Sequence, residues 1–200
     1  MDFKNSKTKE NLMRAFAGES QARNRYTFGA GEAREKGLYV IEGIFTFTAG
    51  QEREHAKVFY NLLQDLSDTT ITVDGTYPVD ISKDVAKLLR YAQHNEFQEH
   101  DVDYKQFAEI AAQEGFAPVA HTFQRIAEVE KTHGERFGRA ADMLEKDMLF
   151  VSSIEEEWMC LNCGYTVKGT NAPAACPVCK HPQGYFIRMT LAPFAGVKVL

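Results

Sequence analysis

The chain has 200 residues, of which 44% are hydrophobic and 26% are charged, and its formal net charge is −5. This composition is that of a folded, soluble protein with room for one sizeable domain and a small one. A net negative charge argues against nucleic acid or an anionic membrane as a partner, because basic surfaces bind both. No apolar run approaches the ~20 residues of a membrane span, and the first residues lack the apolar core of a signal peptide. We therefore expect a cytoplasmic protein with no membrane partner.

Four long helices are predicted in the first part of the chain. They are rich in Ala, Glu, Lys and Arg, and they are interrupted by glycines, by one segment of β-branched residues, and by a proline that opens the last helix. The predicted helices span residues 8–35, 38–66, 82–114 and 118–147. The sequence therefore predicts an all-α four-helix bundle over residues 1–147.

The connection between the second and third predicted helices, residues 67–80, is the only long one. Fourteen extended residues reach at most ~46 Å, while a helix of 28 residues is ~42 Å long. The connection can therefore cross from one end of the bundle to the other. Helices two and three could then run parallel, as they do in ferritin-like bundles.

Polar residues interrupt the apolar stripe of the second predicted helix. The stripe alternates steps of four and three, the spacing of a helix face that points into a bundle, and Glu52 and His55 lie in its middle. The fourth predicted helix repeats this arrangement with Glu130 and His133. A single Glu-x-x-His on a helix is common and carries little information, but two at matching stripe positions are specific.

The other two predicted helices also bring carboxylates to about mid-length. Glu19 lies at the centre of the first stripe, and Glu96 and Glu99 lie on the third. The third stripe loses its regularity after Glu99, because either Val102 or Asp103 could continue it. Helices one and two, and then three and four, thus look like a repeated helical hairpin.

Five glutamates and two histidines that converge inside a bundle would be unfavourable alone, because an unpaired buried charge costs several kcal/mol. No lysine or arginine lies on these stripes near the centre, so a metal is the natural counter-charge. Two helices with Glu-x-x-His and two with further glutamates form the ligand set of a di-iron or di-manganese site. Such ligands suit iron or manganese better than zinc. Tyr26 and Tyr104 are expected either as core aromatics or as donors to the ligand carboxylates.

The character of the sequence changes after residue 147. Residues 148–157 are predicted as a linker, and residues 158–200 form a second region that is too small to rely on a hydrophobic core. This region has two C-x-x-C pairs separated by twelve residues, which in a chain without an export signal favours a metal over disulfides. Spacing alone leaves iron and zinc open. The cysteines are Cys160, Cys163, Cys176 and Cys179, and residues 190–200 have no assigned role.

Taken together, these motifs resemble the rubrerythrin family over the chain up to about Arg188. The motifs are Glu19, Glu52-x-x-His55, Glu96-x-x-Glu99 and Glu130-x-x-His133, followed by CxxCGY and CPxC. The resemblance implies a ferritin-like di-iron bundle followed by a rubredoxin-like Fe(Cys)4 domain. It implies that Glu52 and Glu130 bridge two irons, that Glu19 and Glu96 are terminal ligands, and that His133 binds the second iron. The first iron would exchange Glu99 for His55 with redox state.

The resemblance also implies an activity, that of a non-haem di-iron peroxidase that reduces hydrogen peroxide to water in oxidative stress protection. Tyr26 and Tyr104 would join the bundle ligands as catalytic residues. Electrons would come from rubredoxin or an NAD(P)H-dependent rubredoxin reductase, as the terminal component of an NADH peroxidase system. They would cross between subunits of a homodimer or higher homo-oligomer.

Two other functions remain open from the sequence: a ferritin-like ferroxidase or iron-binding protein, and a metal-binding bundle with a structural zinc ribbon. One residue departs from the expected pattern. Gly134 follows His133 where a helix former is expected, which predicts a looser helix at that point.

Overall fold

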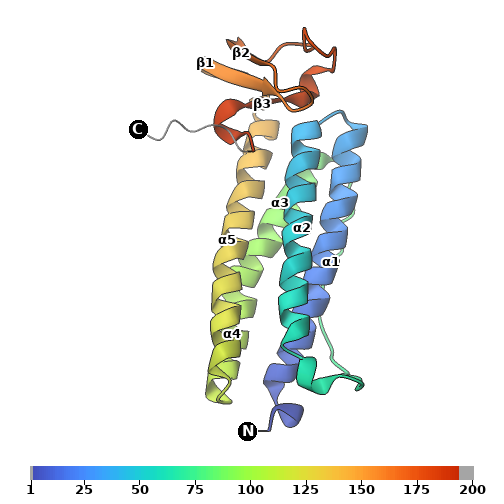
Figure 1. Ribbon diagram of the computed structural model, residues 1–200, viewed down its shortest axis with the longest axis vertical. Helices are drawn as coiled ribbons and strands as arrows, with labels where there is room; N and C mark the ends of the chain where they lie inside the picture. The colour runs from blue at the N-terminus through green and yellow to red at the C-terminus, as the bar shows by residue number, and fades with distance from the viewer. Residues whose placement is uncertain (1, 194–200) are drawn as a thin grey trace.

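The structure is a computed structural model that describes residues 2–193, and it contains a long helical bundle with a small β-sheet at one end (Figure 1). The predicted fold class, a helical bundle followed by a small region that holds the four cysteines, is confirmed. No helix in the described part of the chain is both long enough and apolar enough to cross a membrane. The bundle helices are α1 (Lys7–Glu35), α2 (Tyr39–Asn61), α3 (Val85–Gln98), α4 (Tyr104–Gln113) and α5 (Ala117–Glu145).

The second helix ends earlier than predicted, at Asn61 rather than Leu66. A short 3-10 helix, η2 (Gln64–Leu66), follows it. Leu63 and Leu66 both pack into the apolar cluster at this end of the bundle, so the chain turns inward instead of continuing straight. Hydrophobic residues past the end of the helix therefore have the spacing of a continued helical stripe, which is why the predicted helix was too long.

The prediction of one continuous helix over residues 82–114 is wrong in its middle. It begins at Val85, after Asp84 accepts hydrogen bonds from the backbone of Ala86 and Lys87, and it is divided by a π-helix, η3 (Glu99–Asp103). The extra residue of a π-turn shifts the inward face, so Tyr104 is the next fully buried position after Glu96. This explains why the stripe lost its regularity after Glu99.

The connection from α2 to α3 crosses the length of the bundle (Figure 1). At one end Ile41 of α2 packs in the same cluster as Leu89 of α3, and at the other end Phe59 of α2 packs with Ala111 of α4. Helix α2 therefore runs parallel to α3 and α4, as the length of the connection allows. Arg14 of α1 anchors the connection through Asp74, whose carboxylate and carbonyl oxygens lie 2.7 and 3.0 Å from its guanidinium nitrogens.

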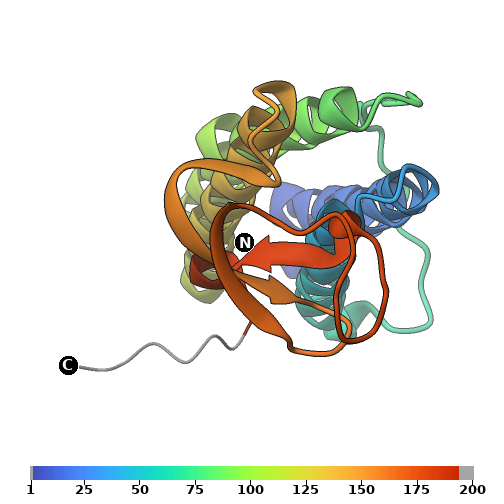
Figure 2. The same cartoon turned by 90° about the horizontal axis from the view of Figure 1, so that it is seen from above.

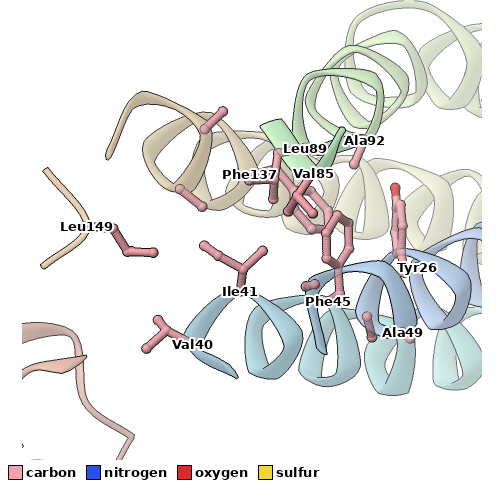
Figure 3. Close-up of a cluster of buried hydrophobic side chains, with 14 of the residues drawn as sticks. Tyr26, Val40, Ile41, Phe45, Ala49, Val85, Leu89, Ala92, Phe137 and Leu149 are labelled. Carbon is pink, nitrogen blue, oxygen red and sulfur yellow. The ribbon is translucent and has the colours of Figure 1, made fainter. Parts of the chain in front are cut away.

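Apolar side chains form two clusters inside the bundle rather than one. The first includes Ile41, Phe45 and Phe137, with Tyr26 at its edge opposite Leu149 (Figure 3). The second includes Phe59 and other buried aromatic residues nearer the opposite end. The α2 residues between the clusters include Glu52 and His55, so a polar layer divides the core.

The C-terminal region is a three-stranded sheet with buried Trp158 at its core. Its strands are β1 (Val151–Cys160), β2 (Thr166–Asn171) and β3 (Phe186–Arg188), in the order β2-β1-β3 with both pairs antiparallel. Short 3-10 helices are η1 (Phe3–Asn5), η4 (Gln183–Tyr185) and η5 (Met189–Leu191).

The boundaries of this region differ from the sequence expectation. Strand β1 begins at Val151, so most of the predicted linker belongs to the sheet. The proposed division into domains at residues 147 and 158 stays a prediction. From residue 194 onward, the tail without an assigned role lies outside the described residues.

The sheet lies over the end of the bundle where α2 begins and α5 ends (Figure 2). The rings of Tyr39 and Tyr185 stack with centroids 4.0 Å apart. Arg188 donates hydrogen bonds to the carbonyl oxygens of Met148 (2.8 Å) and Val151 (2.6 Å). The tyrosine stack and the bond from Arg188 to Met148 hold the four-cysteine module against the end of the bundle.

Gly134 does not loosen its helix, because α5 is continuous through it. Close packing leaves no room for a side chain here, because a Cβ at this position would lie 2.9 Å from the Phe97 ring of α3. We expect Gly134→Ala to lower the free energy of unfolding by about 1–2 kcal/mol, because overpacking outweighs the gain in helix propensity.

Chemical denaturation of the metal-loaded protein measures this effect. Gly31→Ala is the matched control, since Gly31 is a helical glycine with no atom within 4 Å of the added Cβ. It should stabilise the protein by about 1 kcal/mol. Equal stabilisation by both substitutions would contradict the packing explanation for Gly134.

Candidate metal centres

Six of the seven predicted bundle ligands gather halfway along the helices. Helix α1 contributes one glutamate, α2 and α5 each contribute a Glu-x-x-His pair, and α3 contributes another glutamate. They form two groups in which the candidate ligand atoms lie within 4.8 Å of one another, Glu19, Glu52, His55 and Glu130 in one, and Glu52, Glu96, Glu130 and His133 in the other. Glu52 and Glu130 belong to both groups, which is the arrangement of two adjacent metal ions that share two carboxylates.

The two shared carboxylates lie between the imidazole rings. Nδ1 of His55 is 2.9 Å from Glu130 and 3.2 Å from Glu52. Nδ1 of His133 is 2.8 Å from Glu130 and 2.9 Å from Glu52. The two rings are nearly parallel, with centroids 5.6 Å apart. The cluster is therefore nearly symmetric about Glu52 and Glu130.

Several of the polar atoms in this cluster are buried and make no hydrogen bond within the described residues. Buried polar groups in native proteins are normally satisfied, so a set of orphaned acceptors facing one another requires a cation. These atoms are Glu19 Oε2, Glu52 Oε1, Glu96 Oε2, both carboxylate oxygens of Glu130, and His133 Nδ1. Carboxylate oxygens with one imidazole in each group fit a pair of iron or manganese ions.

Protons partly balance the carboxylate charge when the cluster holds no metal. Burial raises the pKa of Glu19 to about 8. Burial alone would lower the pKa of each histidine, but the glutamates in contact with the two rings outweigh it and raise the pKa of His55 to about 10 and that of His133 to about 11. Because a ligating imidazole must be neutral, metal ions displace these protons, and metal affinity rises with pH.

Two tyrosine hydroxyls donate hydrogen bonds to the outer carboxylates. Tyr104 donates to Glu19 at 2.5 Å, and Tyr26 donates to Glu96. Burial, followed by the nearby glutamates, raises the pKa of both tyrosines well above the usual value. Both phenols therefore stay protonated and orient the two carboxylates. Of the two expectations for these tyrosines, the structure supports the role of donors to ligand carboxylates over that of core aromatics alone.

Sequence reasoning missed the residues that orient His133. Arg136 donates a hydrogen bond at 3.1 Å to the amide oxygen of Gln51, and that oxygen lies 3.1 Å from Nε2 of His133. An oxygen that accepts from arginine must accept from the imidazole too, so Nε2 carries a proton and Nδ1 faces the cluster. Gln51 lies beside the stripe, and no periodicity could have identified it.

Glu99 is the predicted ligand that does not join either group. It lies at the start of η3 and is partly exposed. Its carboxyl group is more enclosed than the residue as a whole, and this burial, with the neighbouring charges of Glu19 and Glu96, raises its pKa well above the usual value. The structure therefore places His55, and not Glu99, among the candidate ligands.

The four cysteines form a second candidate centre. Their sulfurs lie within 4.8 Å of one another, with Cys160 and Cys179 3.7 Å apart and Cys163 and Cys176 3.6 Å apart. A tetrahedron with metal–sulfur bonds of ~2.3 Å has edges of about 3.8 Å. The spacing therefore fits one metal ion on four thiolates.

A backbone amide favours the thiolate form of Cys179 in particular. A backbone hydrogen bond from His181 lowers the pKa of Cys179 to about 6. Gly164, which follows the first C-x-x-C pair, has a φ of 76°, a conformation that glycine adopts without strain. In both C-x-x-C pairs a backbone hydrogen bond closes the turn, from Gly164 to Cys160 (2.8 Å) and from Lys180 to Cys176 (2.9 Å).

The fold and the two clusters define a dimetal-carboxylate helical bundle fused to a four-cysteine metal module. The rubrerythrin family profile matches residues 10–141, and the profile of the rubrerythrin, rubredoxin-like domain matches residues 158–187. The chain belongs to the rubrerythrin family. Its bundle accordingly holds a di-iron carboxylate and histidine site, and its C-terminal module is a rubredoxin-like four-cysteine site.

Individual relatives agree with this membership. Rubrerythrin-1 of Clostridium acetobutylicum is 44% identical over 92% of this chain and 95% of its own length. Rubrerythrin of Clostridium perfringens is 42% identical with the same coverage. A mixed-valence structure of nigerythrin is similar with a TM-score of 0.61, 28% identity, and coverage of 92% of this chain and 90% of that one. These findings support an iron-dependent protein of oxidative stress protection.

Proposed function

We propose that the protein is a peroxidase that reduces hydrogen peroxide to water at the bundle site and receives its electrons through the four-cysteine centre. The balanced reaction is H2O2 + 2 H⁺ + 2 e⁻ → 2 H2O. The observation that carries the proposal is the fusion of a redox-type cysteine centre to a buried dimetal site. Iron storage needs a path for iron to leave, and it has no use for an attached electron donor.

The proposed roles follow from the geometry of the cluster. Glu52 and Glu130 would hold both metal ions, because each belongs to both ligand groups. Glu19 and His55 would hold one metal ion, and Glu96 and His133 would hold the other. Two ferrous ions held there would supply both electrons for one peroxide. Tyr26 and Tyr104 hold protons beside the carboxylates and exclude water from them.

Glu99 is proposed to replace His55 as a ligand in one redox state. In the described arrangement His55 is in the ligand group and Glu99 is not. The position of Glu99 on a π-turn suits such an exchange, because these turns lack the regular helical ladder and recur at functional sites.

The proposed partners are a rubredoxin or an NAD(P)H-dependent rubredoxin reductase as donor, in the cytoplasm, and a second copy of the chain. Glu52 lies thirteen positions after Tyr39, which contacts the cysteine module, or about 20 Å further along α2. This separation within one chain favours electron transfer from the cysteine centre of one subunit to the bundle of another.

A stopped-flow comparison tests the proposed activity. The protein is reduced without oxygen and mixed with hydrogen peroxide or with dioxygen, and the oxidation of both iron centres is followed by absorbance. We expect peroxide to oxidise the protein faster than dioxygen does. Rapid oxidation by dioxygen with a slow response to peroxide would contradict the proposal and favour a ferroxidase. A colourless cysteine centre would instead indicate zinc.

A further inference from the structure

A pocket of about 280 Å³ lies between the α2–α3 connection and the bundle, next to the metal cluster. Its lining passes from Gly75 and Thr76, which are exposed, to Tyr104, which is only 2% exposed and donates its hydroxyl to Glu19. The pocket therefore reaches from the surface of the protein to a residue that contacts a candidate ligand. It has room for a small polar molecule.

Arg25 of α1 lines this pocket, and two of its guanidinium nitrogens have no acceptor among the described residues. Its Nε and Nη1 atoms are buried, and neither makes a hydrogen bond to any residue that the structure describes. Buried donors are rarely left unpaired, because losing the hydration of a polar group costs free energy. The acceptor for Arg25 is therefore expected to come from the occupant of the pocket.

Glu99 lines the same pocket. No ion pair joins Glu99 to Arg25 within 4.0 Å in the described residues, although the charge of Arg25 lowers the pKa of Glu99 against the larger effect of burial. The pocket thus presents guanidinium donors and a carboxyl group that do not satisfy each other directly. A small ligand that both donates and accepts hydrogen bonds can connect them.

Hydrogen peroxide has this chemistry. Each of its oxygens carries one O–H donor and lone pairs, so one oxygen can accept from Arg25 while the other exchanges a hydrogen bond with Glu99 in either protonation state. Dioxygen has no donor and is a poor acceptor. We propose that Arg25 and Glu99 form a binding site for hydrogen peroxide beside the metal pair and that this site favours peroxide over dioxygen. This inference rests on the proposed peroxidase function.

The connection holds the outer wall of the pocket in place. Tyr77 donates its hydroxyl to the backbone carbonyl of Arg14 at 3.2 Å, and Arg14 binds Asp74. Gly75 is needed at this turn, because a Cβ there would lie 2.7 Å from the Tyr77 ring. The entrance is therefore built from fixed side chains and does not need to fold on binding.

Arg25→Met tests the site, because methionine keeps a long side chain and removes the donors. In the stopped-flow assay, the second-order rate constant with peroxide should fall about tenfold or more, as for loss of a hydrogen bond from a charged group. The rate constant with dioxygen should not change. Arg25→Lys, which keeps the charge but not the planar fork, should fall between wild type and Arg25→Met.

Arg23→Met is the matched control, since Arg23 is an exposed arginine on the same helix that does not line this pocket. It should leave both rate constants unchanged. Iron content and the absorbance of the cysteine centre, measured on every variant, verify that the fold and both metal sites are intact.

A second readout does not depend on turnover. Zinc-loaded full-length protein cannot reduce peroxide, so crystals of it soaked in hydrogen peroxide should show density for two bonded oxygen atoms, at the O–O distance of a peroxide, between Arg25 and Glu99. The ligand should be absent in Arg25→Met crystals. If the wild type reacts rapidly with peroxide but Arg25→Met keeps its rate and its selectivity, the inference is overturned while the peroxidase proposal stands. If the wild type itself fails to reduce peroxide, the proposed function fails first.

Discussion

Replacing Glu130 with alanine is expected to strip the bundle of iron and to abolish peroxide reduction. Glu130 belongs to both ligand groups, and both of its carboxylate oxygens are buried without a hydrogen bond. Removing one partner from a buried ionic cluster costs about 3–5 kcal/mol, and here the loss affects both metal ions at once. Iron per chain, measured by metal analysis after anaerobic purification, should therefore fall together with turnover.

The cysteine centre provides an internal standard in this experiment, because its absorbance should not change in Glu130→Ala. Glu128→Ala is the matched control: Glu128 lies on the same helix, but its side chain is 72% exposed and outside the cluster. It should keep the full iron content and rate. A Glu130→Ala protein that retained two bundle irons and full turnover would show that Glu130 does not bridge the pair.

Replacing Cys160 with serine should give a protein that reacts once and then stops. Serine does not ionise at neutral pH and supplies a hard oxygen, so the four-sulfur site loses a ligand and its iron. The bundle ligands lie on other elements and should keep their metals. Reduced protein should still be oxidised by peroxide, but repeated turnover with the electron donor should disappear.

Val178→Ser is a suitable control for this variant. Val178 lies between Cys176 and Cys179, is 63% exposed, and contributes no sulfur. It should keep both the visible absorbance and continuous turnover. Continuous turnover of Cys160→Ser at the wild-type rate, with the same donor, would mean that electrons reach the bundle without the cysteine centre.

The sequence was sufficient to find most of the bundle cluster, because helical periodicity is a local property. Glu52 and Glu130 occupy positions where an apolar residue is expected, and the free-energy cost of burying their charges implied a cation. The matching Glu-x-x-His pairs then predicted that both histidines belong to the same cluster. The structure brings these four residues within contact distance of one another.

Residues off the stripe could not be found in this way. Gln51 acts through the ring of His133, and Arg25 faces a pocket whose other wall is formed by a distant connection. Neither the contact of Gln51 nor the position of Arg25 can be recognised from a sequence pattern, because each depends on how separate segments pack. The π-turn at Glu99 had an indirect signature, an irregular stripe, that single-helix periodicity could not interpret.

The start of the sheet was missed for a different reason. Most of β1 before Trp158 is exposed or half-buried, so it carries no regular alternation of apolar and polar residues. Its pairing with β2 is also irregular between Val151 and Glu156. Backbone hydrogen bonds, rather than side-chain burial, make this segment a strand, and a hydrophobicity pattern cannot detect them.

Because the polar layer lies between the two apolar clusters, the bundle metals contribute to holding the helices together. Metal affinity for the folded bundle adds directly to its resistance to unfolding, and repulsion among the carboxylates takes its place when the metals leave. Iron starvation would therefore weaken the centre of the bundle first, between two ends that remain packed. The abundance of the intact chain in a cell would then follow iron supply, because proteases attack whichever molecules have opened.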